Sequence, residues 1–271
     1  MSEVAPLGPF SLDAALRFLD SFAPAGAAGQ GATYAAAHVV DGAPVVVRVT
    51  DAGGGRLDVT PGAAVPLVRR MFCLDWDGEA FAALEDPVVA ALRRAYPGLR
   101  PVLFASPWEA LAWAVIGHRI PMAQAARLKD ALRDELGPEV EGARAFPPPE
   151  AVLAHGAPGL PAIKAERLKA LAARAAAGEL DAERLRAMEP DAARAWLERS
   201  PGIGPWSSAF VLIRAVGFTD LLPTAERRLA ASVAAHYGLS AAPTDEELAA
   251  IAAAWSPFRA WAAFLLRVDA R

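Results

Sequence analysis

A short loop rich in glycine and proline, "RSPGIGPWSSAF" (199–210), holds residues whose types and spacing suggest chemistry. Gly202 and Gly204 flank Ile203, and Pro205 follows where the next apolar stretch begins. Glycine lets the backbone approach a ligand closely, and proline suits the first turn of a helix. Unpaired N–H groups at a helix start favour an anion, so this loop could bind a phosphate. An ordinary hairpin between two helices would use the same residues, because short glycine patterns are weak signals.

A second candidate group is the carboxylate of Glu226, in "DLLPTAERRL" (220–229). It stands at the start of a helix that the sequence predicts over residues 225–238. The simplest role for an acidic residue there is to complement the positive end of the helix. Asp220 is expected to cap the preceding turn.

The elements that must position these groups change character along the chain. Residues 11–22 place apolar side chains on one helical face, and residues 32–50 predict two strands around an Asp-Gly turn. Residues 51–61 add a further turn and a short strand. From Asp86 onward we expect helices alone, over 86–96, 106–120, 122–136, 163–178, 191–200, 205–217, 225–238 and 244–255. The pattern predicts an α+β protein in which an N-terminal antiparallel sheet with a helix precedes mainly α-helical structure.

Composition narrows the classes of protein and of site. With 271 residues, 54% hydrophobic and 21% charged, the chain fits a folded globular protein. Cys73 is the only cysteine and the four histidines lack ligand spacing, so we expect no metal site. The formal net charge of −4 argues mildly against general nucleic-acid binding but leaves room for a local basic face. Without an apolar run of membrane length or a signal peptide, a cytoplasmic location is expected.

The sequence around the glycine loop resembles the helix-hairpin-helix DNA glycosylases, and within them the bacterial 3-methyladenine DNA glycosylase II (AlkA-like) group. The segment "LERSPGIGPWSSAFVLIRAVGFTDLLPTAERRL" (197–229) has the group's PGIG hairpin, a Trp-Ser pair and an acidic residue after Asp and Pro. Residues 10–19, 97–132 and 160–180 resemble other segments of the group in the same order.

The resemblance implies an N-terminal α+β domain over 1–88 and two mainly helical domains, one formed by 89–112 with 230–271 and one by 113–229. The DNA-binding cleft would lie between the helical domains. It also implies a chemistry in which a flipped, damaged base is held in an aromatic pocket and its N-glycosidic bond is hydrolysed. Flipping is required because the bond is out of reach within stacked duplex DNA.

For the DNA backbone, the resemblance implies that Gly202, Ile203 and Gly204 offer N–H groups to a phosphate near the lesion. The hydroxyls of Ser207 and Ser208 would add contacts, which position the DNA without reading its sequence. Members of the family often hold a monovalent cation at the hairpin carbonyls, and no other cofactor is expected.

For the base pocket, the resemblance implies Trp206, Phe210 and Phe18. Trp206 stands where relatives that also cut the strand have a lysine nucleophile, so no Schiff base can form there. This implies a monofunctional enzyme that uses water, and the indole could stack on a cationic alkylated base. The two phenylalanines could equally be core residues. Arg267 falls where the best-known members have a pocket tryptophan, which leaves base selectivity open.

Two further roles follow from the resemblance. His118 and Arg119, in "VIGHRI" (115–120), match the turn that carries the intercalating wedge, although the family prefers glutamine with an apolar neighbour. A solvated surface turn is the alternative. Glu226 matches the catalytic aspartate, which stabilises the oxocarbenium-like sugar and orients or deprotonates water. Glutamate adds one methylene, about 1.5 Å of reach.

The sequence therefore predicts a monofunctional DNA glycosylase of base excision repair. Its partner would be double-stranded DNA with alkylated bases of the 3-methyladenine type, and the enzyme would act as a monomer away from membranes. The alternative is a catalytically weak lesion-binding or DNA-architectural protein on the same scaffold, because the aspartate is replaced. A helical protein-interaction module would leave the hairpin and Trp206 unexplained.

Overall fold

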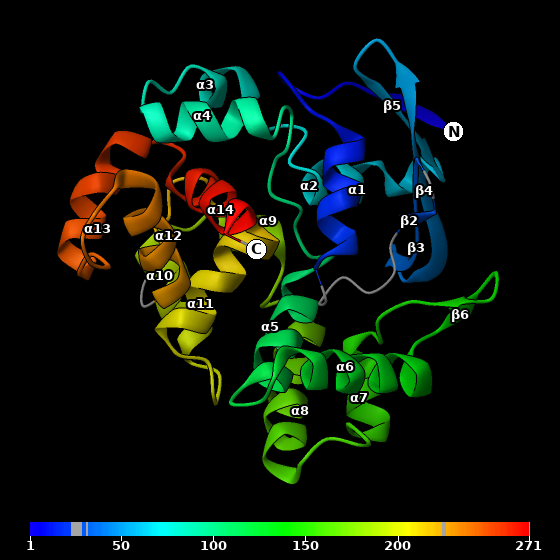
Figure 1. The fold of residues 1–271 in the computed structure, drawn as a ribbon. Helices are drawn as coiled ribbons and strands as arrows, with labels where there is room; N and C mark the ends of the chain where they lie inside the picture. The colour runs from blue at the N-terminus through cyan, green and yellow to red at the C-terminus, as the bar shows by residue number, and fades with distance from the viewer. Residues whose placement is uncertain (23–28, 31, 224–225, 271) are drawn as a thin grey trace.

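The computed structural model describes residues 1–22, 29–30, 32–223 and 226–270. An antiparallel five-stranded sheet forms one side of the molecule, in the order β1-β5-β4-β3-β2 (Figure 1). Its strands are β1 (Ser2–Val4), β2 (Gly29–Gln30), β3 (Thr33–Val40), β4 (Ala43–Gly53) and β5 (Arg56–Thr60).

The Asp-Gly turn joins β3 to β4, as the sequence predicts. Asp41 has φ 50° and Gly42 has φ 78°, the left-handed pair that suits the twist of a two-residue hairpin. Val47 and Val49 are buried on one face of β4, whereas Arg48 between them is exposed. This alternation turns one face of the sheet toward the core.

The helices make up the rest of the described chain. In chain order they are α1 (Leu12–Asp20), η2 (Gly62–Ala64), α2 (Val65–Met71), α3 (Gly78–Ala82), α4 (Pro87–Ala95), α5 (Pro107–Gly117), α6 (Met122–Leu136), α7 (Pro149–His155), α8 (Ala162–Ala176), α9 (Ala182–Arg186), α10 (Pro190–Glu198), α11 (Pro205–Val211), η3 (Leu212–Val216), α12 (Arg227–Tyr237), α13 (Asp245–Ala252), η4 (Ala253–Trp255) and α14 (Arg259–Asp269).

Several helices begin where capping chemistry predicts. The Ser11 hydroxyl accepts the N–H of Ala14 at the start of α1, and Asp86 and Ser106 cap α4 and α5 in the same way. The hydroxyl of Thr244 and the carboxylate of Glu247 form a reciprocal capping box at α13. These local signals explain why the starts of these helices were readable from sequence.

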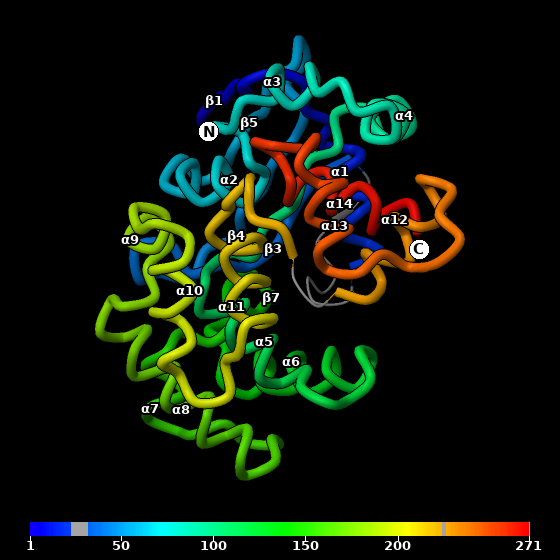
Figure 2. Tube along the Cα trace, turned by 90° about the vertical axis from the view of Figure 1, so that its left-hand side faces the viewer, coloured from blue at the N-terminus to red at the C-terminus, as the bar shows by residue number. Residues whose placement is uncertain are grey.

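Two clusters of buried side chains divide the core. One joins the sheet to α1, α2, α4 and α12–α14, so the two ends of the chain share a core. The other joins α5–α11 with η3 around α5, whose central residues are buried on every side. Figures 1 and 2 show α14 lying between the sheet side of the molecule and the helices α11 and α12. The three-domain division stays a prediction.

The structure corrects two expectations about secondary structure. A short hairpin, β6 (Glu139–Val140) with β7 (Ala143–Arg144), occurs where only helices were expected. Its Glu141-Gly142 turn is left-handed, and Arg48 of β4 pairs with Glu141 at 2.5 Å, so contact with the first sheet supports strands of two residues. The predicted helix 205–217 is interrupted, since α11 gives way to the π-helical turn η3.

No single helix among the described residues is both long enough and apolar enough to cross a membrane. Only the bent pair formed by Asp245–Trp255 and Arg259–Asp269 meets the length and composition of a span, when both helices are taken together.

Candidate active site and nucleic-acid interface

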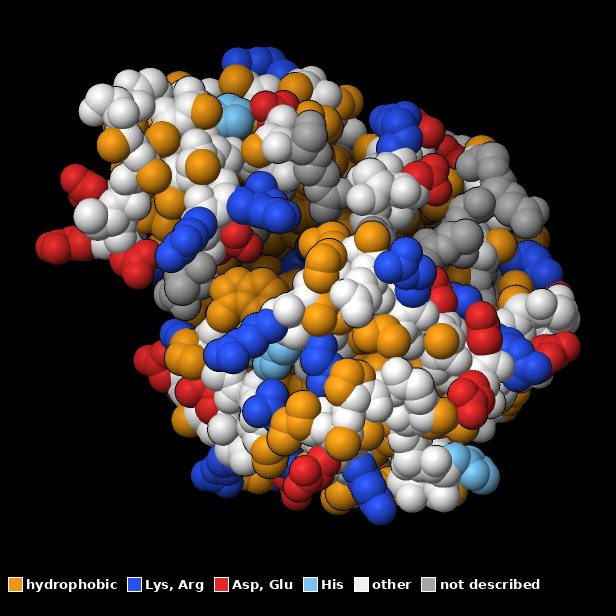
Figure 3. All heavy atoms as spheres, turned by 60° about the horizontal axis from the view of Figure 1, so that its bottom comes forward, with side chains coloured by type: hydrophobic (Ala, Val, Ile, Leu, Met, Phe, Trp, Pro, Cys, Tyr) orange, Lys and Arg blue, Asp and Glu red, His pale blue; other side chains and the backbone are white. Residues whose placement is uncertain are grey.

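A cleft of about 650 Å³ lies between the two core clusters. Its walls come from five places in the chain: Phe22 after α1, the end of α5 with the following turn and the start of α6, the helix pair α11 and η3, the start of α12 with Pro223, and α14. Figure 3 looks onto a hollowed face in which hydrophobic side chains lie between Lys and Arg side chains. Segments more than 150 residues apart in sequence therefore build one site.

Helical spacing explains which residues face the cleft. Along α11 and η3, residues three and four apart lie on one face. The lining residues of this face are Trp206, Ala209, Phe210, Ile213 and Arg214. The lining residues of α14 follow the same rule and are Ala260, Ala263, Phe264 and Arg267.

The aromatic wall contains two of the three predicted pocket residues. Trp206 is 41% exposed and stacks on Phe210 with ring centroids 5.3 Å apart and planes 8° apart. A large aromatic ring left open in a cleft is available to stack on a planar ligand. Trp113 of α5 and Phe22 also line the cleft.

Phe18, the third predicted pocket residue, does not line the cleft. It is 4% exposed and packs behind the wall, 5.2 Å from the ring of Phe22 and 4.9 Å from that of Phe264. The resemblance implies a pocket role for Phe18, but the residue that lines the cleft is Phe22, four residues later. Phe18 therefore supports the aromatic wall instead of forming it.

The predicted glycine hairpin joins α10 to α11. Gly202 has φ +84°, and a Cβ there would lie 2.7 Å from the Arg167 side chain, so glycine is required. Ile203 is buried in the core, and its N–H already bonds the carbonyl of Ser200 at 3.1 Å. Among the described residues, no acceptor takes the N–H of Gly202 or Gly204. These two amides, but not that of Ile203, are open to a phosphate.

The two serines after the hairpin also differ from expectation. Ser208 is fully buried and donates to Glu198 at 2.6 Å, which ties the start of α11 to the end of α10. Ser207 is 3% exposed, and its hydroxyl lies 3.3 Å from Nε2 of His118. Both hydroxyls are engaged inside the protein, so the predicted contact with DNA would require them to leave these partners.

The predicted wedge residues lie at the rim of the cleft. Arg119 is exposed, with a left-handed φ of 56°, whereas His118 is half-buried against Ser207. Burial, and then the nearby Arg167 and Lys164, lower the pKa of His118, so its ring is neutral at pH 7. Lys164 holds the turn because its Nζ donates to the carbonyls of Ile116 at 2.5 Å and His118 at 2.9 Å. Arg119 is the better placed of the two to reach DNA.

Glu226 lies at the N-terminus of α12 and also lines the cleft. Its Oε1 accepts the N–H of Arg228 at 3.1 Å, which caps the helix. No donor among the described residues contacts Oε2. One carboxylate thus combines the capping role with an oxygen that is free to act in the cleft.

No family model matches the sequence. A curated relative does: the chain is 30% identical over 213 residues to the DNA-3-methyladenine glycosylase of Bacillus subtilis (strain 168), covering 74% of this chain and 70% of that protein. The chain belongs to the AlkA-like, helix-hairpin-helix DNA glycosylases.

Solved structures agree with this glycosylase in fold. A 3-methyladenine DNA-glycosylase from Archaeoglobus fulgidus superposes with a TM-score of 0.86 at 22% identity, covering 100% of this chain and 98% of that one. The Schizosaccharomyces pombe 3-methyladenine DNA glycosylase Mag1, solved with abasic DNA, gives a TM-score of 0.56 at 22% identity over 70% of this chain and 94% of that one. The agreement extends over the whole chain in the first case.

The lining residues of the glycosylase that were not anticipated from sequence include Trp113 and Arg214. Trp113 belongs to a helix that is apolar on every side, so the sequence pattern does not indicate which of its residues face the cleft. Arg214 lies eight residues after Trp206 on the same helical face, so the spacing could have revealed it. Its guanidinium lies 4.6 Å from the ring centroid of Phe22 and 5.5 Å from that of Phe264.

The cleft of the glycosylase is basic although the whole chain is acidic. Its lining has one carboxylate, that of Glu226, and four arginines, namely Arg119, Arg214, Arg228 and Arg267. Burial lowers the pKa of Arg267, and the nearby Glu226 opposes this effect. The net charge of −4 for the whole chain therefore does not indicate the charge of this face.

Asp220 is held by an ion pair and takes no part in the cleft. Its carboxylate accepts from Arg259 Nε at 2.8 Å, from Arg259 Nη2 at 2.9 Å and from Ser256 at 3.0 Å. Burial alone would raise the pKa of Asp220, but these bonds outweigh it and the net pKa falls below the ordinary 3.8. Asp220 thus ties the loop before Glu226 to the start of α14.

We expect Asp220→Asn to lower the free energy of unfolding by about 1–2 kcal/mol at pH 7, since charge-assisted hydrogen bonds are lost. A depressed pKa gives stability that is present above the ordinary pKa of 3.8 and is lost as the pH falls through the folded value. The gap between wild type and variant should therefore shrink at acidic pH in urea unfolding. A gap that did not change with pH would contradict the ion-pair account.

Proposed function

We propose that this glycosylase releases alkylated bases from double-stranded DNA by hydrolysis, with Glu226 as its catalytic carboxylate. The observation that carries the proposal is that Glu226 lines the same cleft as Trp206 and Phe210. A flipped base that stacked on Trp206 would bring its sugar toward the carboxylate. The curated relative is named for 3-methyladenine, which supports an alkylated purine as substrate.

The proposed reaction breaks one bond and forms one. As the bond between the base nitrogen and C1′ of the sugar breaks, positive charge develops on C1′ and the ring oxygen. The Glu226 carboxylate stabilises this charge and accepts a proton from water, whose oxygen bonds to C1′. The products are a free base and an abasic sugar. Trp206 offers no amine for a Schiff base, which supports a monofunctional reaction.

The hairpin supplies the proposed contacts with the DNA backbone. The N–H groups of Gly202 and Gly204 would bind a phosphate, and Arg119 would fill the space left by the flipped base. A monovalent cation at the hairpin carbonyls, and action as a monomer, stay proposals of the same kind.

Gly204→Asp tests the hairpin cleanly. Gly204 has an extended backbone, and a Cβ there would meet no atom within 4 Å, so aspartate fits without strain. A carboxylate beside a phosphate should weaken binding about tenfold on lesion and undamaged DNA alike, because phosphate contacts carry no sequence information. Fluorescence anisotropy at fixed salt would measure both dissociation constants.

Gly204→Asn is the matched control, since it has the same shape without the charge. It should bind nearly as well as wild type. If Gly204→Asp bound undamaged DNA normally, the hairpin would not contact a phosphate.

A lesion-binding protein without turnover is the second candidate, and the capping bond from Arg228 to Glu226 is the observation that favours it. Incubation with methylated duplex DNA, followed by chromatography of free bases, separates the two. Release of base in excess of enzyme supports hydrolysis. Tight binding to damaged duplex without any released base would support the lesion-binding reading.

A further inference from the structure

The seven residues Arg214–Asp220, here called the exit segment, lead from the cleft wall toward Glu226. They begin within η3, where the N–H of Gly217 bonds the carbonyl of Leu212 at 2.9 Å, five residues back. A π-turn of this kind widens the helix and ends it early. The last carbonyls of η3 then need partners from elsewhere in the protein.

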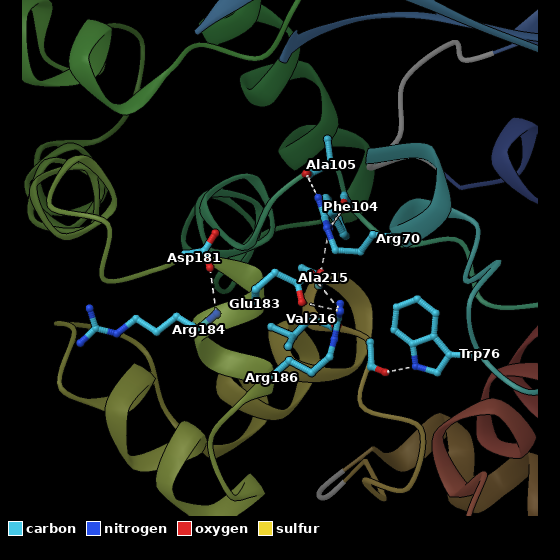
Figure 4. Close-up of polar contacts among 11 residues, drawn as sticks. Arg70, Trp76, Phe104, Ala105, Asp181, Glu183, Arg184, Arg186, Ala215 and Val216 are labelled. Atoms are coloured by element: carbon cyan, nitrogen blue, oxygen red, sulfur yellow. Dashed lines mark hydrogen bonds and ion pairs between the residues drawn. The ribbon is translucent and has the colours of Figure 1, made fainter. Parts of the chain in front are cut away.

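Three side chains from outside the helix donate hydrogen bonds to these carbonyls (Figure 4). Arg70 of α2 donates to Ala215 at 2.9 Å, and Arg186 of α9 donates to Val216 at 2.6 and 3.1 Å. The indole of Trp76 donates to Gly217 at 2.9 Å. Three consecutive carbonyls are thus held by three different parts of the chain. We call Arg70, Trp76 and Arg186 the clamp.

The clamp is interlocked and fits closely. The Arg186 guanidinium lies 4.7 Å from the ring centroid of Trp76. Gly217 has φ +89°, and a Cβ there would lie 2.6 Å from the Trp76 ring. Arg70 also donates to the carbonyls of Phe104, at 3.1 Å, and of Ala105. The exit segment is therefore pinned against the loop before α5 as well as against Trp76.

A role in stability alone does not explain why the clamp contains a buried arginine. Burial, and then the nearby Arg186, lower the pKa of Arg70, and the hydrogen bonds of its guanidinium to the described residues all go to carbonyl groups. Burying a charge costs free energy, which the nearby Glu183 and Asp181 offset only in part, and a well-packed apolar side chain often serves stability as well. A guanidinium does what an apolar group cannot, because it fixes several carbonyls in one plane.

The fixed segment reaches the start of α14, which also lines the cleft. Beyond the clamp, the N–H of Ala260 bonds the carbonyl of Thr219 at 2.8 Å, and Arg259 holds Asp220. Glu226 follows six residues later, and Ile213 and Arg214 line the cleft just before the clamped carbonyls. The clamp and the contacts of Thr219 and Asp220 therefore hold the chain between the cleft wall and the residues that precede Glu226.

We propose that Arg70, Trp76 and Arg186 are positioning residues for base release, which set the place of Glu226 although none of them lines the cleft. The proposal rests on the proposed catalytic role of Glu226. Displacement by about 1 Å, even from a distant change, can cost on the order of a hundredfold in rate. The clamp would therefore act on the chemical step and leave the DNA-binding surface unchanged.

The experiment compares clamp variants with a matched control. Trp76→Phe removes one donor but keeps a ring against Gly217, and Arg70→Met removes the charge at similar length. The control is Arg93→Met, because Arg93 is another arginine that donates to two carbonyls, those of Phe81 and Leu84, which lie outside the exit segment. Single-turnover base release from methylated duplex, affinity for undamaged duplex and thermal unfolding are measured for each.

We expect both clamp variants to slow single-turnover release by about tenfold or more with affinity unchanged. Arg93→Met should lower thermal stability while its rate stays at the wild-type value. Equal rates in the clamp variants and the control would overturn the proposal. Trp76→Phe keeps the test valid even if Arg70→Met does not fold.

Hydrogen exchange without DNA gives a readout that does not need activity. Amides of residues 212–222 should exchange faster in Trp76→Phe than in wild type, and Arg93→Met should not show this change. Unchanged exchange in this segment would overturn the clamp even if the wild type released no base. A wild type that released no base, together with faster exchange in Trp76→Phe, would contradict the proposed function but not the clamp.

Discussion

Glu226→Gln is expected to lower the rate of base release by at least about a hundredfold, which corresponds to roughly 3 kcal/mol of lost transition-state stabilisation. Glutamine keeps the size of the side chain, and its carbonyl oxygen can still accept the N–H of Arg228. Folding and DNA affinity should therefore survive, and affinity should be equal to or slightly above that of the wild type because a negative charge near phosphates is lost. Single-turnover release of base from methylated duplex is the measurement.

Glu226→Asp is the companion variant. It restores the side chain usual in the family but shortens the reach by about 1.5 Å. If the backbone places position 226 as the family does, aspartate should equal or exceed glutamate in rate. If the start of α12 lies further from the cleft, aspartate should be slower. Wild-type activity in Glu226→Gln would rule out the catalytic role and leave helix capping as the function of this carboxylate.

Trp206→Ala is expected to reduce release of a cationic base such as 3-methyladenine by about tenfold to a hundredfold, since base–aromatic stacking contributes about 1–3 kcal/mol. One face of the indole stacks on Phe210, and the ring is 41% exposed in the cleft. Affinity for a duplex with an abasic analogue should fall much less, because that ligand has no base to stack. The two measurements are single-turnover release and the dissociation constant of the abasic duplex.

Trp206→Phe is the control for this prediction. It retains a smaller aromatic face and should recover part of the lost rate. Equal losses on the methylated and the abasic substrates in Trp206→Ala would mean that Trp206 supports the fold around Phe210 and does not hold the base.

Parts of the site that depend on neighbours in sequence were predictable. The Asp-Gly turn, the capped helices and the left-handed Gly202 follow from backbone rules that act within a few residues. Trp206 and Phe210 share a face because residues four apart do so in any helix. The order of the motifs was enough to indicate the family, which the Bacillus relative confirms.

Only the tertiary structure decided which of these groups are free. The sequence offers Ser207 and Ser208 for contact with DNA, but in the folded protein their hydroxyls contact His118 and Glu198. It likewise offers Phe18 for the pocket, but the ring of Phe18 packs against that of Phe22. Helical spacing tells which residues share a face, but it does not tell what packs against that face.

The sequence by itself determined the types of residue that we propose for contact with DNA, namely the hairpin glycines, an indole and a carboxylate. The tertiary structure decided how they are placed. Arg70 meets Ala215 across 145 positions of the chain, and Trp76 meets Gly217 across 141. A carbonyl oxygen is the same acceptor in every residue, so the sequence does not indicate which arginine will donate a hydrogen bond to it. That pairing is settled only when the core clusters close and bring these distant segments within hydrogen-bonding distance.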